Sequence, residues 1–147
     1  MSGESNASPP WATADRLRAV LAGLNDVDWA ALSHAYGPAV DTADLLRQAA
    51  SHDSQAASEA LNELHASIFH QGTVYSSTPV AVPFLVELAR GAPHHRADVA
   101  WMLGMLADDR HAYGTSLPAV RAAVGAQSGQ LIVLMADEQE DVREAAA

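Results

Sequence analysis

Apolar residues recur every three or four positions along most of the chain, a spacing that places them on one face of an α-helix. The longest such stretch predicts a helix from Asp53 or Ser54 to about His70. Its apolar positions are Ala57, Ala60, Leu61, Leu64 and Ile68. No segment alternates apolar and polar residues for long enough to predict a strand. The pattern therefore predicts an all-α fold.

Capping residues, glycines and prolines divide the rest of the chain into further helices. These are predicted at about 14–24, 27–36, 41–50, 78–90, 94–107, 118–124 and 131–135, with a last one starting near residue 140. Asp41 is expected to cap the helix that follows it, and Gly37 with Pro38 is expected to end the helix before. Pro83 is expected to delay or kink its helix, because proline lacks the N–H that the helix interior requires.

A period of about 42 residues relates the predicted helix pairs to one another. In the second helices of the pairs, this period superposes Ala57, Val99 and Val142. In the first helices, it superposes Leu46, Leu88 and Leu131. Such a period is typical of helical repeats of about 40 to 47 residues. Each pair has one strong apolar stripe, so neighbouring pairs must cover it by stacking. We predict a core that contains Leu61, Leu64, Val99, Leu103 and Leu106.

The most specific motif lies at the end of the chain. An apolar segment, 131–135, is followed by an acidic turn, by Asp141-Val142-Arg143 and by an alanine run. This order resembles the HEAT-repeat consensus, although Ser58 and Ala100 stand in the place of Arg143 in the earlier units.

Two further segments, 68–75 and 81–85, resemble uncharacterised actinobacterial HEAT-repeat proteins. The resemblance covers about residues 41–147. It implies a right-handed α-α superhelix, a HEAT-like solenoid, in which the unmatched helices before residue 37 form an N-terminal cap.

The two ends of the chain differ from its middle. Residues 1–13 are rich in serine, asparagine, glycine and proline and are predicted to be disordered. We expect residues 14–147 to form a single HEAT-like domain, truncated within its last repeat, because the final helix has only two turns and no stop signal. Truncation would leave Leu131, Val133 and Leu134 partly uncovered and favour self-association through the C-terminal end.

Composition narrows the classes of function. The chain has 18 acidic and 8 basic residues, a net charge of −10, and its basic residues are all arginines spaced singly along the chain. This acidity argues against nucleic-acid binding and favours a basic protein partner. The chain has no cysteine, no secretory signal and no apolar stretch of the roughly 18 to 20 residues that a membrane span needs. We expect a cytoplasmic protein that does not bind membranes.

Candidate catalytic chemistry is sparse. His65 and His70 are five residues apart, one more than a shared helix face requires, and the adjacent His94 and His95 are expected to point apart. Three histidines near helix ends are expected to bond carbonyl groups there: His34, His70 and His111. Gly-x-Ser-x-Gly and phosphate-loop motifs are absent. We therefore expect no catalytic, metal or cofactor-binding residues, no cofactor and no enzyme activity.

Two features are candidates for partner binding. The polar segment 70–75 is either a ligand-facing loop or a turn in which Gly72 adopts a positive φ and Tyr75 packs over a repeat junction; the turn is favoured. Trp101 either anchors a partner or packs between repeats, and packing is favoured. The candidate partner-binding residues are His70, Gln71, Tyr75 and Trp101.

The HEAT-like resemblance implies a non-enzymatic scaffold that binds a protein partner through its solenoid surface. Two alternatives remain open: a HEAT-like nucleic-acid enzyme similar to DNA glycosylases, and a bilin-lyase-like protein. The chain's charge is unsuitable for the first, and the second rests on fold analogy alone.

Overall fold

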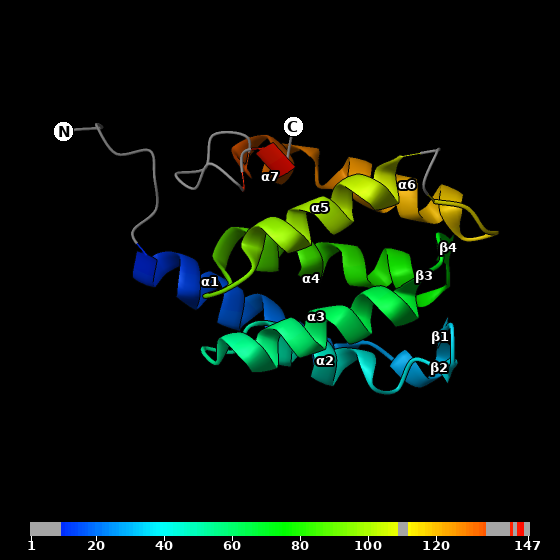
Figure 1. The fold of residues 1–147 in the computed structure, drawn as a ribbon, viewed down its shortest axis with the longest axis horizontal. Helices are drawn as coiled ribbons and strands as arrows, with labels where there is room; N and C mark the ends of the chain where they lie inside the picture. The colour runs from blue at the N-terminus through cyan, green and yellow to red at the C-terminus, as the bar shows by residue number, and fades with distance from the viewer. Residues whose placement is uncertain (1–9, 109–111, 135–141, 143, 146–147) are drawn as a thin grey trace.

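The computed structural model describes residues 10–108, 112–134, 142, 144 and 145. This part of the chain is mostly helical, as the apolar spacing predicts (Figure 1). The α-helices are α1 (Pro10–Ala22), α2 (Thr42–Ala49), α3 (Ser54–Ile68), α4 (Ser77–Gly91), α5 (Arg96–Ala107), α6 (Leu117–Ala126) and α7 (Ser128–Leu134). Two short 3-10 helices, η2 (Gly23–Asp26) and η3 (Trp29–Ala31), follow α1.

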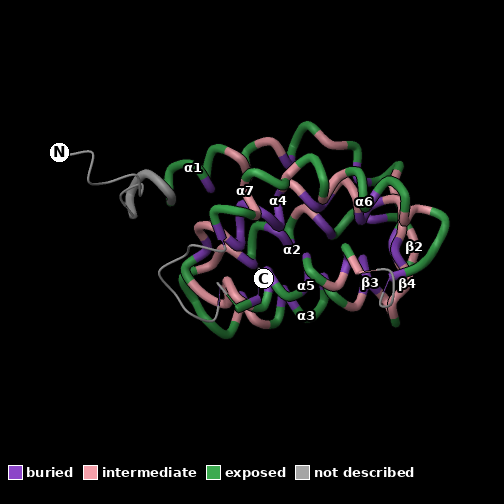
Figure 2. Tube along the Cα trace, turned by 90° about the horizontal axis from the view of Figure 1, so that it is seen from above, coloured by how far each residue is buried: buried purple, intermediate pink, exposed green. Residues whose placement is uncertain are grey.

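Helix α4 lies at the centre of the molecule. It packs against α1, α5, α6 and α7, whereas α2 packs mainly against α3. The sequence of α4 is apolar on nearly all sides, so burial on several faces is the favourable arrangement for it. Most of its residues are buried, coloured purple in Figure 2.

The predicted core residues of α3 and α5 are buried, which confirms that the apolar stripes of these two helices face the core. They are Leu61, Leu64, Val99, Leu103 and Leu106. The core also takes in aromatic side chains from other elements: the Trp29 and Phe84 rings lie 6.2 Å apart, centroid to centroid.

Two antiparallel hairpins lie at one end of the molecule, on the right in Figure 1. One pairs β1 (Ser33–His34) with β2 (Gly37–Pro38), and the other pairs β3 (Phe69–His70) with β4 (Thr73–Val74). Strands of two residues are too short to show alternation, which is why the apolar pattern did not predict them.

The predicted helix at 27–36 is wrong. The segment forms η3 and β1 instead, because Trp29 is buried and its indole N–H donates to the carbonyl oxygen of Leu24 at 3.1 Å. Gly37 follows at a φ of +123°, as the first residue of β2 directly after the hairpin turn and not at a helix end. Long-range burial of one tryptophan therefore outweighs the local helical spacing.

Three expectations about how helices begin also differ from the structure. Helix α1 already begins at Pro10, ahead of the expected Ala14, since proline is well suited to a first turn. Asp41 occupies the N-cap position of α2 but makes no side-chain cap; it accepts a hydrogen bond from His34 Nε2 at 2.8 Å. Pro83 lies inside α4 without delaying its start, which is at Ser77.

The predicted last helix falls mostly outside the described residues, within which Val142 and Ala145 are buried. On α7, Leu131 is half-buried and Val133 is exposed as expected. Leu134, expected to be partly uncovered, is buried.

Candidate functional site

A groove with a volume of about 240 Å³ lies between α3 and α5. Each helix contributes side chains at spacings of three and four residues, so each presents one row to the groove. The two rows include Leu61, Asn62 and His65 from α3 and Asp98, Trp101 and Met105 from α5. The site is thus built by two helices that are separated along the chain by α4.

Trp101 provides the main apolar surface of the groove. The residue is 57% exposed, so packing between the neighbouring helices does not bury it. Met102 is buried beneath the groove and Met105 is half-buried, and both thioethers are adaptable apolar contacts. An exposed tryptophan in a concave surface is the residue type that contributes most binding energy at protein interfaces.

His95 closes one end of the groove. It adopts a left-handed backbone, with a φ of +62°, and its Nε2 donates to the carbonyl oxygen of Ser54 at 2.9 Å. A left-handed backbone costs about 1 to 2 kcal/mol in a residue with a Cβ, and the hydrogen bond helps to offset that cost. The His95 Nδ1 lies 3.6 Å from Asp98 Oδ2, on the first turn of α5.

The neighbouring His94 donates from Nε2 to the carbonyl oxygen of His52 at 2.9 Å. The rings of His94 and His95 lie 6.0 Å apart, and both reach the loop between α2 and α3. The expectation that they point apart is wrong, because the left-handed backbone at His95 brings both rings to the same side. Together they fasten the start of α5 to the start of α3.

The other three candidate residues lie at the β3–β4 hairpin and do not line the groove. Gln71 and Gly72 form its two-residue turn with φ of +51° and +87°, as a type I′ turn requires. The positive φ predicted for Gly72 is therefore confirmed. His70, at the end of β3, donates from Nδ1 to the carbonyl oxygen of Ala66 at 3.1 Å, as expected for a histidine near a helix end. Tyr75 is half-buried beyond β4.

Tyr113, which precedes α6, joins the turn of this hairpin. Its N–H donates to the carbonyl oxygen of Gly72 at 2.9 Å, and its carbonyl oxygen accepts from the N–H of Val74 at 2.9 Å. Its hydroxyl donates to the carbonyl oxygen of Gln71 at 2.9 Å. The hairpin therefore serves as a junction between elements, which supports the turn interpretation.

A second junction, around Tyr36, was not predicted from the sequence. The Tyr36 ring packs edge-on against His70, 5.6 Å away, and against His34, 6.0 Å away. A repeated motif could have indicated it, because His-Ala-Tyr-Gly occurs at 34–37 and again at 111–114. His34 bonds Asp41 rather than a helix-end carbonyl, and His111 lies outside the described residues.

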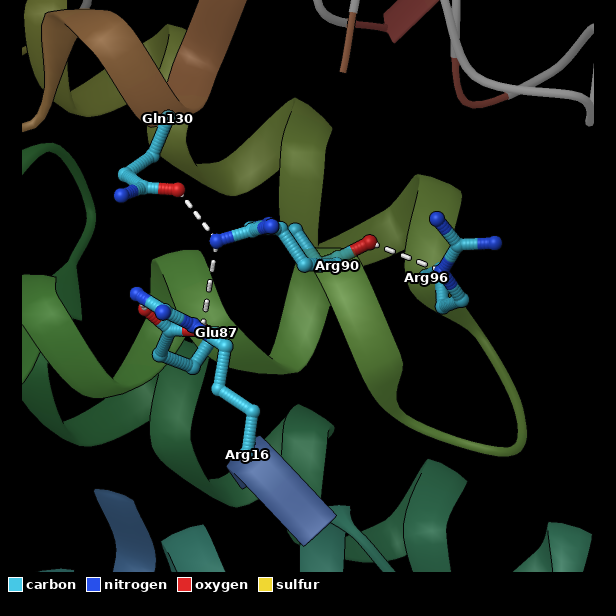
Figure 3. A network of polar contacts seen from close by, with 6 residues as sticks. Arg16, Glu87, Arg90, Arg96 and Gln130 are labelled. Atoms are coloured by element: carbon cyan, nitrogen blue, oxygen red, sulfur yellow. Dashed lines mark hydrogen bonds and ion pairs between the residues drawn. The ribbon is translucent and has the colours of Figure 1, made fainter. Parts of the chain in front are cut away.

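A polar network joins α1, α4 and α7 (Figure 3). Glu87 of α4 is 6% exposed and accepts two hydrogen bonds from Arg16 of α1, at 2.8 and 3.0 Å. Arg90 lies 3.8 Å from Glu87 and donates to the side-chain oxygen of Gln130 on α7. The hydrogen bonds and the charge of Glu87 raise the pKa of Arg16, so its guanidinium stays charged. The network connects the first and last described helices through α4.

Two features are absent from the described part of the chain: a cluster of metal-ligating side chains and a membrane-spanning helix. No group of three histidine, aspartate or glutamate side chains there could hold a metal ion. None of the helices there is long and apolar enough to cross a membrane.

No protein-family model, curated protein or solved structure matches the chain.

Proposed function

We propose that this protein is a non-enzymatic, HEAT-like scaffold that binds a segment of a protein partner in the groove between α3 and α5. The observation that carries the proposal is the exposed Trp101, held in a concave surface between two helices. Burial of a tryptophan side chain by a partner removes a large apolar area from water and stabilises the complex accordingly.

Contacts that recur near the predicted period support a repeat architecture. The hydrogen bonds His94 to His52, His95 to Ser54 and Tyr113 to Gln71 join residues 42, 41 and 42 positions apart. Contacts at a constant separation are what stacked repeats of that length produce. The pairs α2–α3 and α4–α5 would then be successive repeats, and the groove would lie between their second helices.

The lining of the groove favours binding over catalysis. Leu61, Trp101, Met102 and Met105 supply its apolar lining, and the His95 Nε2 is already engaged by the carbonyl oxygen of Ser54. A groove that holds an apolar segment and presents a few polar groups at its rim is the usual arrangement for peptide recognition.

The proposal is tested with three versions of the protein as bait: the parent, Trp101→Ala and Ile132→Ala. Ile132, on α7 and 65% exposed, controls for the loss of an exposed apolar side chain elsewhere. The informative partner is one that the parent and Ile132→Ala retain and Trp101→Ala loses. With that partner purified, calorimetry should show Trp101→Ala weakening the affinity by about tenfold or more.

Thermal melts of the three versions check that folding is intact. A partner that binds the Trp101→Ala variant as tightly as it binds the parent would remove the groove from the proposal.

A further inference from the structure

The chemistry of the partner is indicated by the charges at the groove. Asp98 and Trp101 lie three positions apart on α5, so their side chains are neighbours on the same helix face. The Asp98 side chain is 73% exposed, and Trp101 is 57% exposed over the whole residue. The groove therefore offers a carboxylate beside an open indole ring.

Among the described residues, the ion-pair partner of Asp98 is His95, which carries a charge only when protonated. No arginine lines the groove, and His95 Nδ1 is 3.6 Å from the Asp98 carboxylate, beyond hydrogen-bond distance. On the neighbouring flank of α3, Glu59 and Glu63 are exposed and add to the negative potential. Asp98 is thus available to an incoming cation.

We propose that the groove selects a partner segment that carries an arginine or lysine side chain beside an apolar residue; this inference rests on the proposed function. The cationic group lies over the indole ring of Trp101, where the ring quadrupole attracts it, and pairs with Asp98. The aliphatic stem of the side chain packs on Leu61 and Met105, as long basic side chains do along apolar surfaces. An acidic side chain would meet the Asp98 carboxylate and be repelled.

The test uses three synthetic peptides and the indole N–H signal of Trp101 in NMR spectra, assigned with a Trp101→Phe variant. The probes are acetyl-Gly-Leu-Arg-Leu-Gly-amide and the same peptide with citrulline or norleucine in place of arginine. Citrulline keeps the shape of arginine and removes its charge. We expect the arginine peptide to bind at least about threefold more tightly than the citrulline peptide.

Two variants test whether the preference for arginine over citrulline depends on Asp98. Asp98→Asn should abolish most of the difference between arginine and citrulline peptides, whereas Asp28→Asn, which removes one exposed charge elsewhere, should preserve it. Equal affinity for the two peptides, or no shift of the Trp101 signal by any peptide at millimolar concentration, would overturn the inference. Neither result bears on whether a natural partner depends on Trp101, so the proposed function is judged separately by the bait experiment.

Discussion

Arg16 of α1 and Glu87 of α4 form a two-point ion pair, with Arg16 Nε 2.8 Å from Glu87 Oε1 and Nη2 3.0 Å from Oε2. The side chain of Glu87 is 8% exposed and that of Arg16 is 47% exposed. The pair therefore joins a buried carboxylate to a guanidinium at the surface, and it fixes where α1 docks on the central helix.

Arg16→Ala should lower the free energy of unfolding by about 1 to 3 kcal/mol, because the buried carboxylate loses both hydrogen bonds. Arg18→Ala is the matched control on the same helix: Arg18 pairs with Asp15 at the surface, and its loss should cost less than about 0.5 kcal/mol. Urea unfolding of both variants measures the difference. Equal costs would show that Glu87 finds another partner when Arg16 is removed.

Leu103→Ala should cost about 2 to 5 kcal/mol, the range for a buried leucine truncated in a packed core. Leu103 is 2% exposed on the buried side of α5, opposite the face that carries Trp101. Ile132→Ala, at a site 65% exposed, should change stability by no more than about 0.5 kcal/mol. A cost below about 1 kcal/mol for Leu103→Ala would contradict the close packing of α5 on α4.

Two glycine substitutions should have opposite signs. Gly114 has a φ of +130°, and an added Cβ would lie 3.0 Å from the carbonyl oxygen of Val74, so Gly114→Ala should destabilise by more than about 1 kcal/mol. Gly125 lies in α6 with open space around its Cβ position, so Gly125→Ala should stabilise by about 0.5 to 1 kcal/mol. Thermal melts compare the two, and stabilisation by Gly114→Ala would refute the strained turn.

Stoichiometric zinc should leave the melting temperature unchanged. His94 and His95 each use one ring nitrogen as a donor to a backbone carbonyl, which withdraws those nitrogens from metal ligation. A metal that binds the folded state tightly would stabilise it by mass action. A rise of several degrees with zinc, reversed by a chelator, would reveal a site that the described residues do not account for.

Much of the helical framework was predictable because amphipathic spacing is a local signal. The stripe in α3 and the buried positions of α5 follow directly from it. The segment around Trp29 was not predictable in this way, since its conformation depends on Phe84 and on a hydrogen bond to Leu24. Local spacing contains no information about either partner.

The groove was predictable only in part. Trp101 stood out because it lies opposite the apolar stripe of its helix. That it remains exposed depends on how α3 and α5 are placed relative to each other, which the spacing within either helix does not specify. The hairpin residues were unusual in sequence for a different reason: Gln71 and Gly72 adopt the positive φ values that a two-residue turn demands, and His70 ends the strand before that turn.

Backbone hydrogen bonds at the hairpin junctions can be used to measure how cooperatively the domain unfolds. The amide protons of Ala35, Val74 and Tyr113 are bonded to the carbonyl oxygens of Ser67, Tyr113 and Gly72, which belong to other segments of the chain. Local fraying of one helix leaves these bonds intact, while undocking of neighbouring segments breaks them. Their rates of hydrogen exchange therefore report whether the helix pairs separate one at a time or only when the whole domain unfolds.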